Sequence, residues 1–368
     1  MKVGIITMHK VMNYGSILQA YATQEIVRKL GYDSELIDYD FPNVWQFSRG
    51  VPQHKLSLKS RISKALHLRK AYAKEPKFKR FIRTHFHMSK EFFTAEELQA
   101  NPPSYDIYLT GSDQVWNYKF TKMDPSFFLS FAPADCPKIA FSSSFAVDAI
   151  PLELEEEMKS RLNTYHSISV REQRGQKIIK ELIGKDVPVT LDPTLALDGE
   201  DWSKLISNPR RKEKYIFLYM LDYAYNPAPY IYDLVRELQK KSGFTVFSNV
   251  EMPEAYGISY RSVADAGIEE FIQLIRDSAL VVTSSFHGVA FSVNFGVPLL
   301  AVVPQDVKAD TRLTSLLDTL DLQNCIVRVN SSFEGLDGVY DKEKEQFLLS
   351  NLRKDSLNYL REALSVQV

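Results

Sequence analysis

The sequence has few cysteines and no long apolar run. Its only cysteines, Cys136 and Cys325, lie far apart and form neither a disulfide framework nor a cysteine-type zinc site. No apolar run reaches the roughly 18 residues that a membrane-spanning helix needs. The amino-terminal segment lacks the long apolar region and small-residue cleavage site of a signal peptide. We therefore expect a cytoplasmic protein.

Neither sign of charge is in excess. Lysine and arginine total 45 and aspartate and glutamate 46, which gives a net charge of −1 at pH 7. Nucleic-acid-binding domains usually carry a positive excess, so we expect no nucleic-acid partner. With 45% hydrophobic and 25% charged residues, 15 glycines and 17 prolines, the composition is typical of globular proteins and excludes collagen-like and disordered chains.

The first half of the chain alternates between apolar strands and amphipathic helices. Residues 2–7 predict a buried strand, 15–30 a helix and 34–38 the next strand. Such a βαβ unit indicates a parallel sheet with a right-handed crossover. Further strands are expected at 106–110, 138–142, 166–170 and 187–191, with helices at about 152–163 and 172–183.

The alternation starts again after residue 213. Strands are expected at 214–221, 244–248, 279–285 and 297–303, and helices at 230–241, 268–278 and 287–296. Two prolines and dense charge predict a linker between the halves. The expected organisation is a Rossmann-like N-terminal domain over 1–191, a linker over 192–213, a Rossmann-like C-terminal domain over 214–341 and a C-terminal helix within 342–368.

These elements predict an α/β protein with parallel sheets, in which two Rossmann-like domains face each other across a cleft. Open α/β sheets bind ligands at the carboxyl ends of their strands. The residues that follow each strand are therefore the candidates for function.

The most informative strand end is TSSFHGVAFSVNFGVP, residues 283–298. Ser284 and Ser285 end a strand, and His287 and Gly288 open an amphipathic helix. The first-turn N–H groups, the hydroxyls and the close approach that glycine permits predict an anion pocket beside a titratable imidazole. The alternative is that Ser285 is an ordinary helix cap and His287 an ordinary first-turn residue.

A second strand end in the first half is LTGSDQVWN, residues 109–117. Ser112, Asp113 and Gln114 crowd the turn, where they are placed to hold sugar hydroxyls. Trp116 either stacks on a sugar face or lies in the core. The alternative for the whole segment is a turn in which Asp113 bonds its own backbone.

Two more strand ends carry candidate ligands. Arg171 follows the strand at 166–170, and its fork of donors suits a carboxylate or phosphate. The alternative is a solvent-exposed charge pair with Glu172. Asn13 follows the first strand, where it either faces a ligand or caps the first helix, and no G-x-G-x-x-G dinucleotide loop is present.

Together these segments resemble the polysaccharide pyruvyl transferase family. The resembling pieces stand in the family's order over roughly residues 10–325: NYGSILQAYA (13–22), GSDQVWN (111–117), SVREQRG (169–175), LDPT (191–194) and TSSFHGVAFSVNFGVP (283–298). The resemblance implies a two-domain fold like that of the GT-B glycosyltransferases. It also implies an enzyme of capsule or other exopolysaccharide biosynthesis in the cell envelope, which transfers a pyruvyl group from phosphoenolpyruvate to a sugar as a ketal.

The resemblance also implies roles for the candidate residues. His287 is expected to be the catalytic group, because a group with a pKa near 7 is suited to moving protons. Expected donor-binding residues are Arg171, Ser284, Ser285, Gly288 and Arg312. Expected acceptor-binding residues, in the first domain, are Asn13, Ser112, Asp113 and Gln114. No metal or cofactor is expected, because nothing in this chemistry requires one.

Two other functions stay open at this point. A GT-B glycosyltransferase that uses a nucleotide sugar would share the architecture, because a fold does not fix a function. A catalytically inactive sugar-binding relative would also share it, although the intact His287 and Arg171 argue against this alternative.

The stretch 49–83 is strongly basic. It holds twelve Lys or Arg and one acidic residue, Glu75, for a net charge of +11. Its apolar residues recur at helical spacing and predict basic amphipathic helices, inserted in the first domain over about 49–90. Because such charge repels itself, we expect contact with an anionic membrane or a lipid-diphosphate-linked acceptor at the inner membrane face. The alternative is a helical excursion packed on its own domain.

Overall fold

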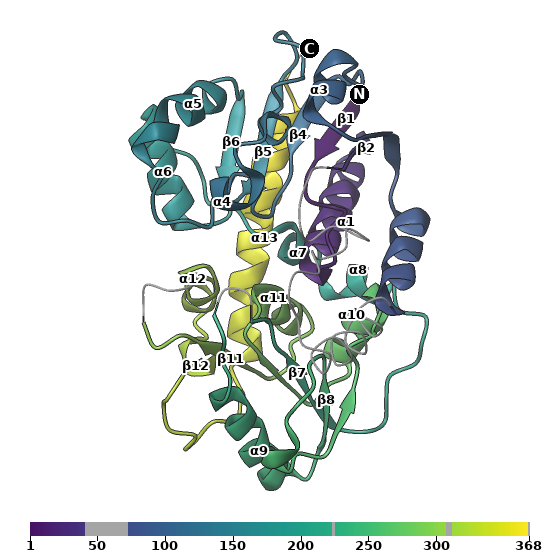
Figure 1. Cartoon of the computed structure of the whole chain (residues 1–368), viewed down its shortest axis with the longest axis vertical. Coiled ribbons are helices and arrows are strands. Elements are labelled where there is room, and N and C mark those ends of the chain that lie inside the picture. Colours follow the sequence, from purple (N-terminus) through teal and green to yellow (C-terminus); the bar gives the residue numbers. More distant parts are fainter. Residues whose placement is uncertain (41–72, 223–224, 307–310, 367–368) are drawn as a thin grey trace, which may run out of the picture. The chain divides into compact units, whose positions relative to one another are not determined.

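The computed structural model describes residues 1–40, 73–222, 225–306 and 311–366 (Figure 1). They form two compact units. Of the described residues, the first unit contains 1–40, 81–197 and 351–366, and the second contains 73–80, 198–222, 225–306 and 311–350. Within the described residues, no helix combines the length and the apolar character needed to cross a bilayer.

The first unit is built on a parallel six-stranded sheet in the order β3-β2-β1-β4-β5-β6. Its strands are β1 (Lys2–Ile6), β2 (Asp33–Tyr39), β3 (Met88–Phe92), β4 (Ile107–Thr110), β5 (Lys138–Ser143) and β6 (Ser167–Val170). Its helices are α1 (Tyr14–Lys29), α3 (Ala95–Ala100), α4 (Tyr118–Thr121), η1 (Pro125–Phe128), α5 (Leu152–Leu162), α6 (Gln173–Ile183) and α7 (Pro193–Ala196).

The first strand and helix illustrate how individual residues determine the elements of this unit. The run KVGII in β1 is buried on both faces, as in a sheet covered on each side. Gly4 is required there, because a Cβ atom would lie 2.1 Å from the Tyr105 ring. Asn13 caps α1, and the chain leaves that helix at Gly31, whose φ of 92° suits glycine.

The second unit repeats the arrangement in the order β12-β11-β10-β7-β8-β9, again all parallel. Its strands are β7 (Tyr215–Tyr219), β8 (Thr245–Ser248), β9 (Tyr260–Ser262), β10 (Leu280–Thr283), β11 (Leu299–Val303) and β12 (Ile326–Arg328). Its helices are α8 (Gly199–Ser203), α9 (Tyr230–Ser242), η2 (Glu254–Tyr256), α10 (Ile268–Arg276), α11 (Phe286–Asn294), α12 (Thr311–Thr319) and η3 (Gln323–Cys325).

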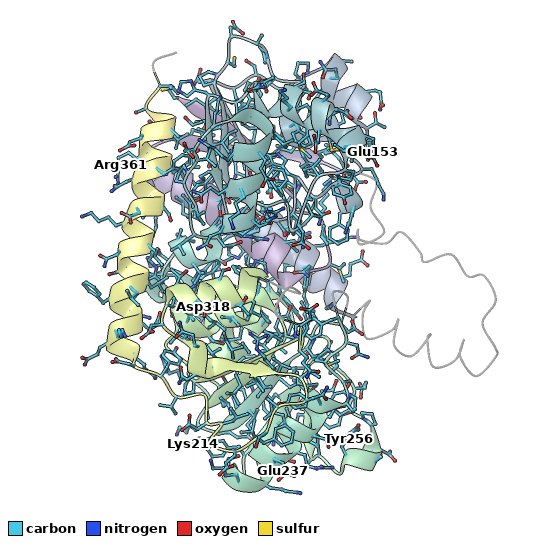
Figure 2. All side chains as sticks on the ribbon, turned by 90° about the vertical axis from the view of Figure 1, so that its left-hand side faces the viewer. Glu153, Lys214, Glu237, Tyr256, Asp318 and Arg361 are labelled. Carbon is cyan, nitrogen blue, oxygen red and sulfur yellow. The ribbon has the colours of Figure 1, made fainter. Side chains whose placement is uncertain are left out.

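The last helix, α13 (Lys342–Leu364), begins in the second unit and ends in the first (Figures 1 and 2). Its carboxyl-terminal half is fixed to the first unit by hydrogen bonds. The Tyr359 hydroxyl donates to the Ala140 carbonyl at 2.9 Å, and the Leu191 N–H donates to the Ser356 hydroxyl at 2.9 Å. This helix therefore completes the first unit from the far end of the sequence.

The structure confirms the α/β class with two parallel sheets and corrects several details. Three short strands, β3, β9 and β12, were not expected. The strand expected at 187–191 is wrong: it makes only an isolated bridge between Val170 and Val189, and Pro188 has no N–H to donate to a ladder.

The linker expected over 192–213 is also folded in part. Residues up to Leu197 belong to the first unit and residues from Asp198 to the second. Trp202 of α8 is fully buried and packs edge-on against Phe291 of α11, with ring centroids 4.9 Å apart. Burial of this large ring makes the segment part of the second unit rather than a free connection.

The basic stretch is described only from residue 73 onward, where residues 73–85 form one helix. We expected the whole stretch in the first domain, but residues 73–80 belong to the second unit and 81–85 to the first. The reason is a pair of ion contacts with α10: Lys77 to Glu270 at 2.8 Å and Arg80 to Glu269 at 3.9 Å. The expected helices between residues 49 and 72 lie outside the described residues.

Glu270 gives a test of this docking contact. Burial alone would raise the pKa of its carboxyl, but hydrogen bonds from Lys77 and from the Gly267 N–H outweigh burial and lower the pKa below the ordinary 4.5. The ionised form therefore stabilises the fold above that pH, and the contribution is lost as the pH falls through the lowered pKa. Because the side chain is half-exposed, Glu270→Gln should lower the free energy of unfolding at neutral pH by no more than about 1 kcal/mol.

Urea denaturation at neutral pH and at about pH 3 measures this difference. We expect the gap between wild type and Glu270→Gln to shrink at the acidic pH. The exposed Glu334 provides the control Glu334→Gln, which should have no effect at either pH. A gap of the same size at both pH values would contradict the assignment.

Candidate functional site

Most candidate residues lie where the strand order of each sheet reverses. In the first sheet, β2 and β3 are added on one side of β1, and β4, β5 and β6 follow on its other side. In the second sheet, β8 and β9 are added on one side of β7, and β10, β11 and β12 follow on its other side. In open α/β sheets, ligands bind at the carboxyl ends of the two strands at such a reversal. The segments after β1, β4, β7 and β10 are therefore the places to examine, each within its own unit.

In the second unit, the residues after β10 are bound tightly to the end of β7. The Ser284 hydroxyl donates to the Leu221 carbonyl at 2.8 Å and accepts from the Leu221 N–H at 2.9 Å. The Thr283 hydroxyl donates to the Tyr219 carbonyl at 2.7 Å. Ser285 caps α11 by accepting from the Gly288 N–H. We expected both serine hydroxyls to face an anion, with an ordinary helix cap as the alternative for Ser285. In this structure Ser285 caps α11, and the Ser284 hydroxyl bonds to the Leu221 backbone.

Gly288 and His287 lie in the first turn of α11. A Cβ atom at position 288 would lie 2.3 Å from the Thr283 hydroxyl oxygen, so this glycine is required by packing against the preceding strand. Packing therefore requires glycine here, and the close approach of a ligand that we expected at this position stays a prediction. His287 is half-buried, with its ring edge-on to Phe286 at 5.2 Å between centroids. Arg312 belongs to α12, and its side chain lies outside the described residues.

In the first unit, the expected acceptor residues take part in local hydrogen bonds. Asn13 caps α1 through the Gly15 and Ser16 N–H groups. Asp113 has a φ of 71°, in the left-handed region, and accepts from the Ser16 hydroxyl at 2.6 Å and from the Gln114 N–H at 2.9 Å. The bond from Ser16 joins the first turn of α1, the helix that follows β1, to the segment after β4.

Gln114 and Trp116 continue this turn. The half-buried Gln114 side chain accepts from the Asn117 amide at 2.8 Å. Trp116 is fully buried, stacks on Phe128 at 6.0 Å between centroids and donates its indole N–H to the Phe127 carbonyl. Of the two expectations for Trp116, the core position is confirmed and the sugar-stacking position is wrong.

Arg171 lies in the same network and not in solvent. Its side chain is 3% exposed, and its Nη1 donates to Asp192 at 2.8 Å. Asp192 also accepts from the Ser112 hydroxyl at 3.1 Å. Burial would lower the pKa of Arg171, but the charges of Asp192, Asp113 and Glu172 outweigh it and raise the pKa, so the guanidinium stays ionised.

This network brings together residues that we had assigned to different substrates. Arg171 was expected on the donor and Ser112 on the acceptor, yet both bond to the Asp192 carboxylate within the first unit. The sequence analysis did not include Asp192 among the site residues, nor Glu172, whose carboxylate accepts from the Ser144 hydroxyl and the Phe145 N–H at 3.0 Å each. LDPT and SVREQRG contain these two acids, and those motifs were the available signal.

For a metal, the described residues offer no group of three or more His, Cys, Asp or Glu side chains arranged to hold an ion.

A family model described as polysaccharide pyruvyl transferase matches residues 13–306, which include every candidate position except Arg312. The chain belongs to the polysaccharide pyruvyl transferase family. Membership makes it a transferase of polysaccharide biosynthesis. A comparison with curated protein sequences gave no match.

Solved structures with a similar fold are distant in sequence. UDP-N-acetylglucosamine 2-epimerase from Rickettsia bellii aligns with a TM-score of 0.52 at 10% identity and covers 98% of this chain and 96% of its own. The corresponding enzyme from Neisseria meningitidis, solved with UDP-GlcNAc, has a TM-score of 0.51 at 10% identity, covering 98% of this chain and 100% of its own. At such identities the likeness shows the fold alone, which is that of the GT-B proteins.

The Arg171–Asp192 pair predicts a large cost for removing one partner. Arg171→Met leaves the Asp192 carboxylate buried without its cation, and loss of one partner of a buried pair typically costs about 3–5 kcal/mol. Chemical denaturation should show a loss of unfolding free energy in that range, and Arg171→Lys should lose less. Lys177→Met, on the exposed side of α6, is the control and should be neutral. Equal stability of wild type and Arg171→Met would contradict the buried pair.

Proposed function

We propose that this family member transfers a pyruvyl group from phosphoenolpyruvate to two hydroxyls of a sugar, forming a ketal. The acceptor is a sugar of a cell-surface polysaccharide or of its lipid-linked precursor. The observation that carries the proposal is the position of His287. It opens α11 directly after the strand at the order reversal of the second sheet, inside the segment that matches the family.

The reaction needs protons moved at defined atoms. A proton is added to the methylene carbon of phosphoenolpyruvate, and a sugar oxygen bonds to the neighbouring carbon. The bond from that carbon to the phosphate oxygen breaks, and the second sugar oxygen takes its place. Of the two hydroxyl protons, one is balanced by the new methyl group and the other leaves with phosphate. An imidazole is suited to passing these protons near neutral pH, which is the role we give His287.

The donor is an anion at every stage, and the second unit offers a matching charge. The amino end of α11 carries partial positive charge, which favours a phosphate or carboxylate beside His287. Ser284, Ser285 and Gly288 shape this turn, and we place the donor there, with Arg312 as a further cationic ligand. The assignment of Arg171 to the donor stays a prediction from the sequence, because its buried pair with Asp192 lies in the first unit. Asn13, Ser112, Asp113 and Gln114 are placed on the acceptor. The proposal includes no metal, because the proton transfers and anion contacts assigned to these side chains do not require one.

The two alternative functions predict different donor binding. A glycosyltransferase would bind a nucleotide sugar in place of phosphoenolpyruvate, and an inactive sugar-binding relative would bind neither donor. Titration calorimetry separates them when phosphoenolpyruvate is compared with UDP-glucose and UDP-N-acetylglucosamine. We expect heat from phosphoenolpyruvate and none from the nucleotide sugars. The reverse pattern would support the glycosyltransferase, and binding of neither donor would favour the inactive relative.

Replacing His287 tests its role directly. His287→Ala should lower kcat by about 10²-fold or more, the usual contribution of general acid–base catalysis, while the affinity for phosphoenolpyruvate changes little. His287→Gln keeps a hydrogen-bonding side chain and separates that function from proton transfer.

The matched control for this experiment is His166→Ala, at the exposed amino end of β6. It should turn over at the wild-type rate. Near-normal turnover by His287→Ala, in a protein that unfolds at the wild-type temperature, would contradict the role of His287 in proton transfer.

The basic stretch is proposed to hold the enzyme at an anionic surface, as a protein located peripherally at the inner face of the membrane. Within the described part, Lys77 and Arg80 pair with α10 and Lys79 pairs with Glu75 at 2.6 Å, so these cations already have acidic partners. Seven of the twelve Lys and Arg residues lie before residue 73. Each cation near an anionic bilayer is worth about 1 kcal/mol, so four would give reversible binding.

Vesicle co-sedimentation tests this proposal. Wild type should bind anionic vesicles better than neutral ones, and less as salt rises. Neutralising Lys55, Lys59, Arg61 and Lys64 to Gln should abolish the binding, whereas the same number of changes at Lys177, Lys180, Lys240 and Lys241 should not. Equal partitioning of wild type and the first variant would reject membrane contact.

A further inference from the structure

A cluster of four ionisable side chains lies at the carboxyl ends of the first three strands of the first unit. We call His9, Lys10, Asp38 and Glu91 the strand-end cluster. His9 and Lys10 follow β1, and Asp38 and Glu91 are the penultimate residues of β2 and β3. Asp38 and Glu91 are paired in register, so their side chains leave the same face of the sheet. The cluster therefore lies at the edge of the sheet where ligands bind.

Lys10 joins the two carboxylates. Its Nζ lies 2.6 Å from Asp38 Oδ1 and 2.5 Å from Glu91 Oε1. Burial would lower the pKa of Lys10, but these two contacts outweigh it and raise the pKa, so the ammonium stays charged. Without this cation, two neighbouring carboxylates would repel each other.

His9 contacts Asp38 from the buried side of the cluster. Its Nε2 lies 3.2 Å from Asp38 Oδ1 and its Nδ1 lies 3.1 Å from the Thr7 carbonyl oxygen. These two contacts fix the ring beside the Asp38 carboxylate. Besides His9, the cluster holds one ammonium and two carboxylates.

The cluster opens to solvent in one direction. Side-chain exposure rises from 1% for His9 to 11% for Asp38, 16% for Lys10 and 43% for Glu91. A partly buried ion network contributes little net stability compared with apolar side chains of similar size. A structural role alone therefore does not explain four ionisable groups here, whereas ligand recognition does.

The chemistry of the cluster indicates the class of ligand. Carboxylates accept hydrogen bonds and an ammonium donates three, of which the two carboxylates take two. A hydroxyl both donates and accepts, so neighbouring hydroxyls can donate to Asp38 or Glu91 and accept from Lys10. An anion such as phosphoenolpyruvate would meet two carboxylates and a single ammonium here, so it gains little. The matching ligand is a neutral polyhydroxyl compound.

We infer that Lys10, Asp38 and Glu91 form a subsite that binds the hydroxyls of the acceptor sugar, with His9 as the residue that positions Asp38. This inference rests on the proposed function for the identity of the ligand as an acceptor. It adds residues at the carboxyl ends of β1, β2 and β3 to those expected after β4, whose polar groups bond largely to one another.

Saturation-transfer NMR tests the subsite with a named probe, the methyl glycosides of glucose, galactose, mannose and N-acetylglucosamine in one mixture. At least one glycoside should receive saturation from wild type. Lys10→Met and Glu91→Gln should weaken its affinity by about tenfold or more, since each removes a hydrogen bond to a charged group. Glu91 is exposed, so Glu91→Gln folds even if Lys10→Met does not.

Two controls match these variants. Lys90→Met changes the neighbouring residue on β3, which points to the other face of the sheet, and Glu96→Gln changes an exposed acid of α3. Both should bind as wild type does, and phosphoenolpyruvate should bind all variants equally in calorimetry.

The outcomes separate this inference from the proposed function. Equal saturation in wild type and Glu91→Gln, or none in wild type, would overturn the subsite. Failure of phosphoenolpyruvate to bind, with the sugar result as expected, would overturn only the proposed donor.

Discussion

Every strand pair in the two sheets is parallel, and this constraint determines where a binding or catalytic site can form. A parallel neighbour is reached only by a crossover, so all carboxyl ends of a sheet gather along one edge. In both units the order reverses once, between β1 and β4 and between β7 and β10. Segments far apart in sequence, such as those around Asn13 and Asp113, therefore meet at one place.

The two units build this edge by different means. In the first, ionic and hydroxyl groups bond to one another, with Asp192 joining Arg171 to Ser112. In the second, hydroxyls bond to backbone, as Ser284 does to Leu221. Both fix the loops after the strands before any ligand is present. Preformed geometry of this kind reduces the cost of ordering when a ligand binds.

Part of this structure follows directly from the sequence. Buried apolar runs such as KVGII and the cap at Asn13 place β1 and α1 correctly, and the final helix matches its expected range. The strands that were missed are short, and β3 (MSKEF) exposes most of its side chains at the edge of its sheet, so it has no apolar signal. The same reason hides the strand-end cluster, because Glu91 meets Asp38 only once β3 is paired with β2.

The site residues could likewise be predicted only in part from the sequence. Motifs after strands identify Ser284, His287 and Arg171 as candidates, because strand ends are where α/β proteins bind ligands. Their partners depend on strand order and register, which the sequence does not display. Thus Arg171 was expected to bind an external anion, whereas the register of β6 beside β5 and the fold of α7 bring Asp192 to it. Likewise, the packing requirement for glycine at position 288 is visible only in the structure, where Thr283 lies against it.

The central claim is the transfer of pyruvate from phosphoenolpyruvate to a sugar. It is tested most directly by ³¹P NMR of the purified full-length chain with phosphoenolpyruvate and a cell-envelope polysaccharide extract. The account predicts that inorganic phosphate is released from phosphoenolpyruvate only when the extract is present, with a new ketal methyl signal in the ¹H spectrum of the polysaccharide. Intact phosphoenolpyruvate, together with release of nucleoside diphosphate when nucleotide sugars replace it, would contradict the account.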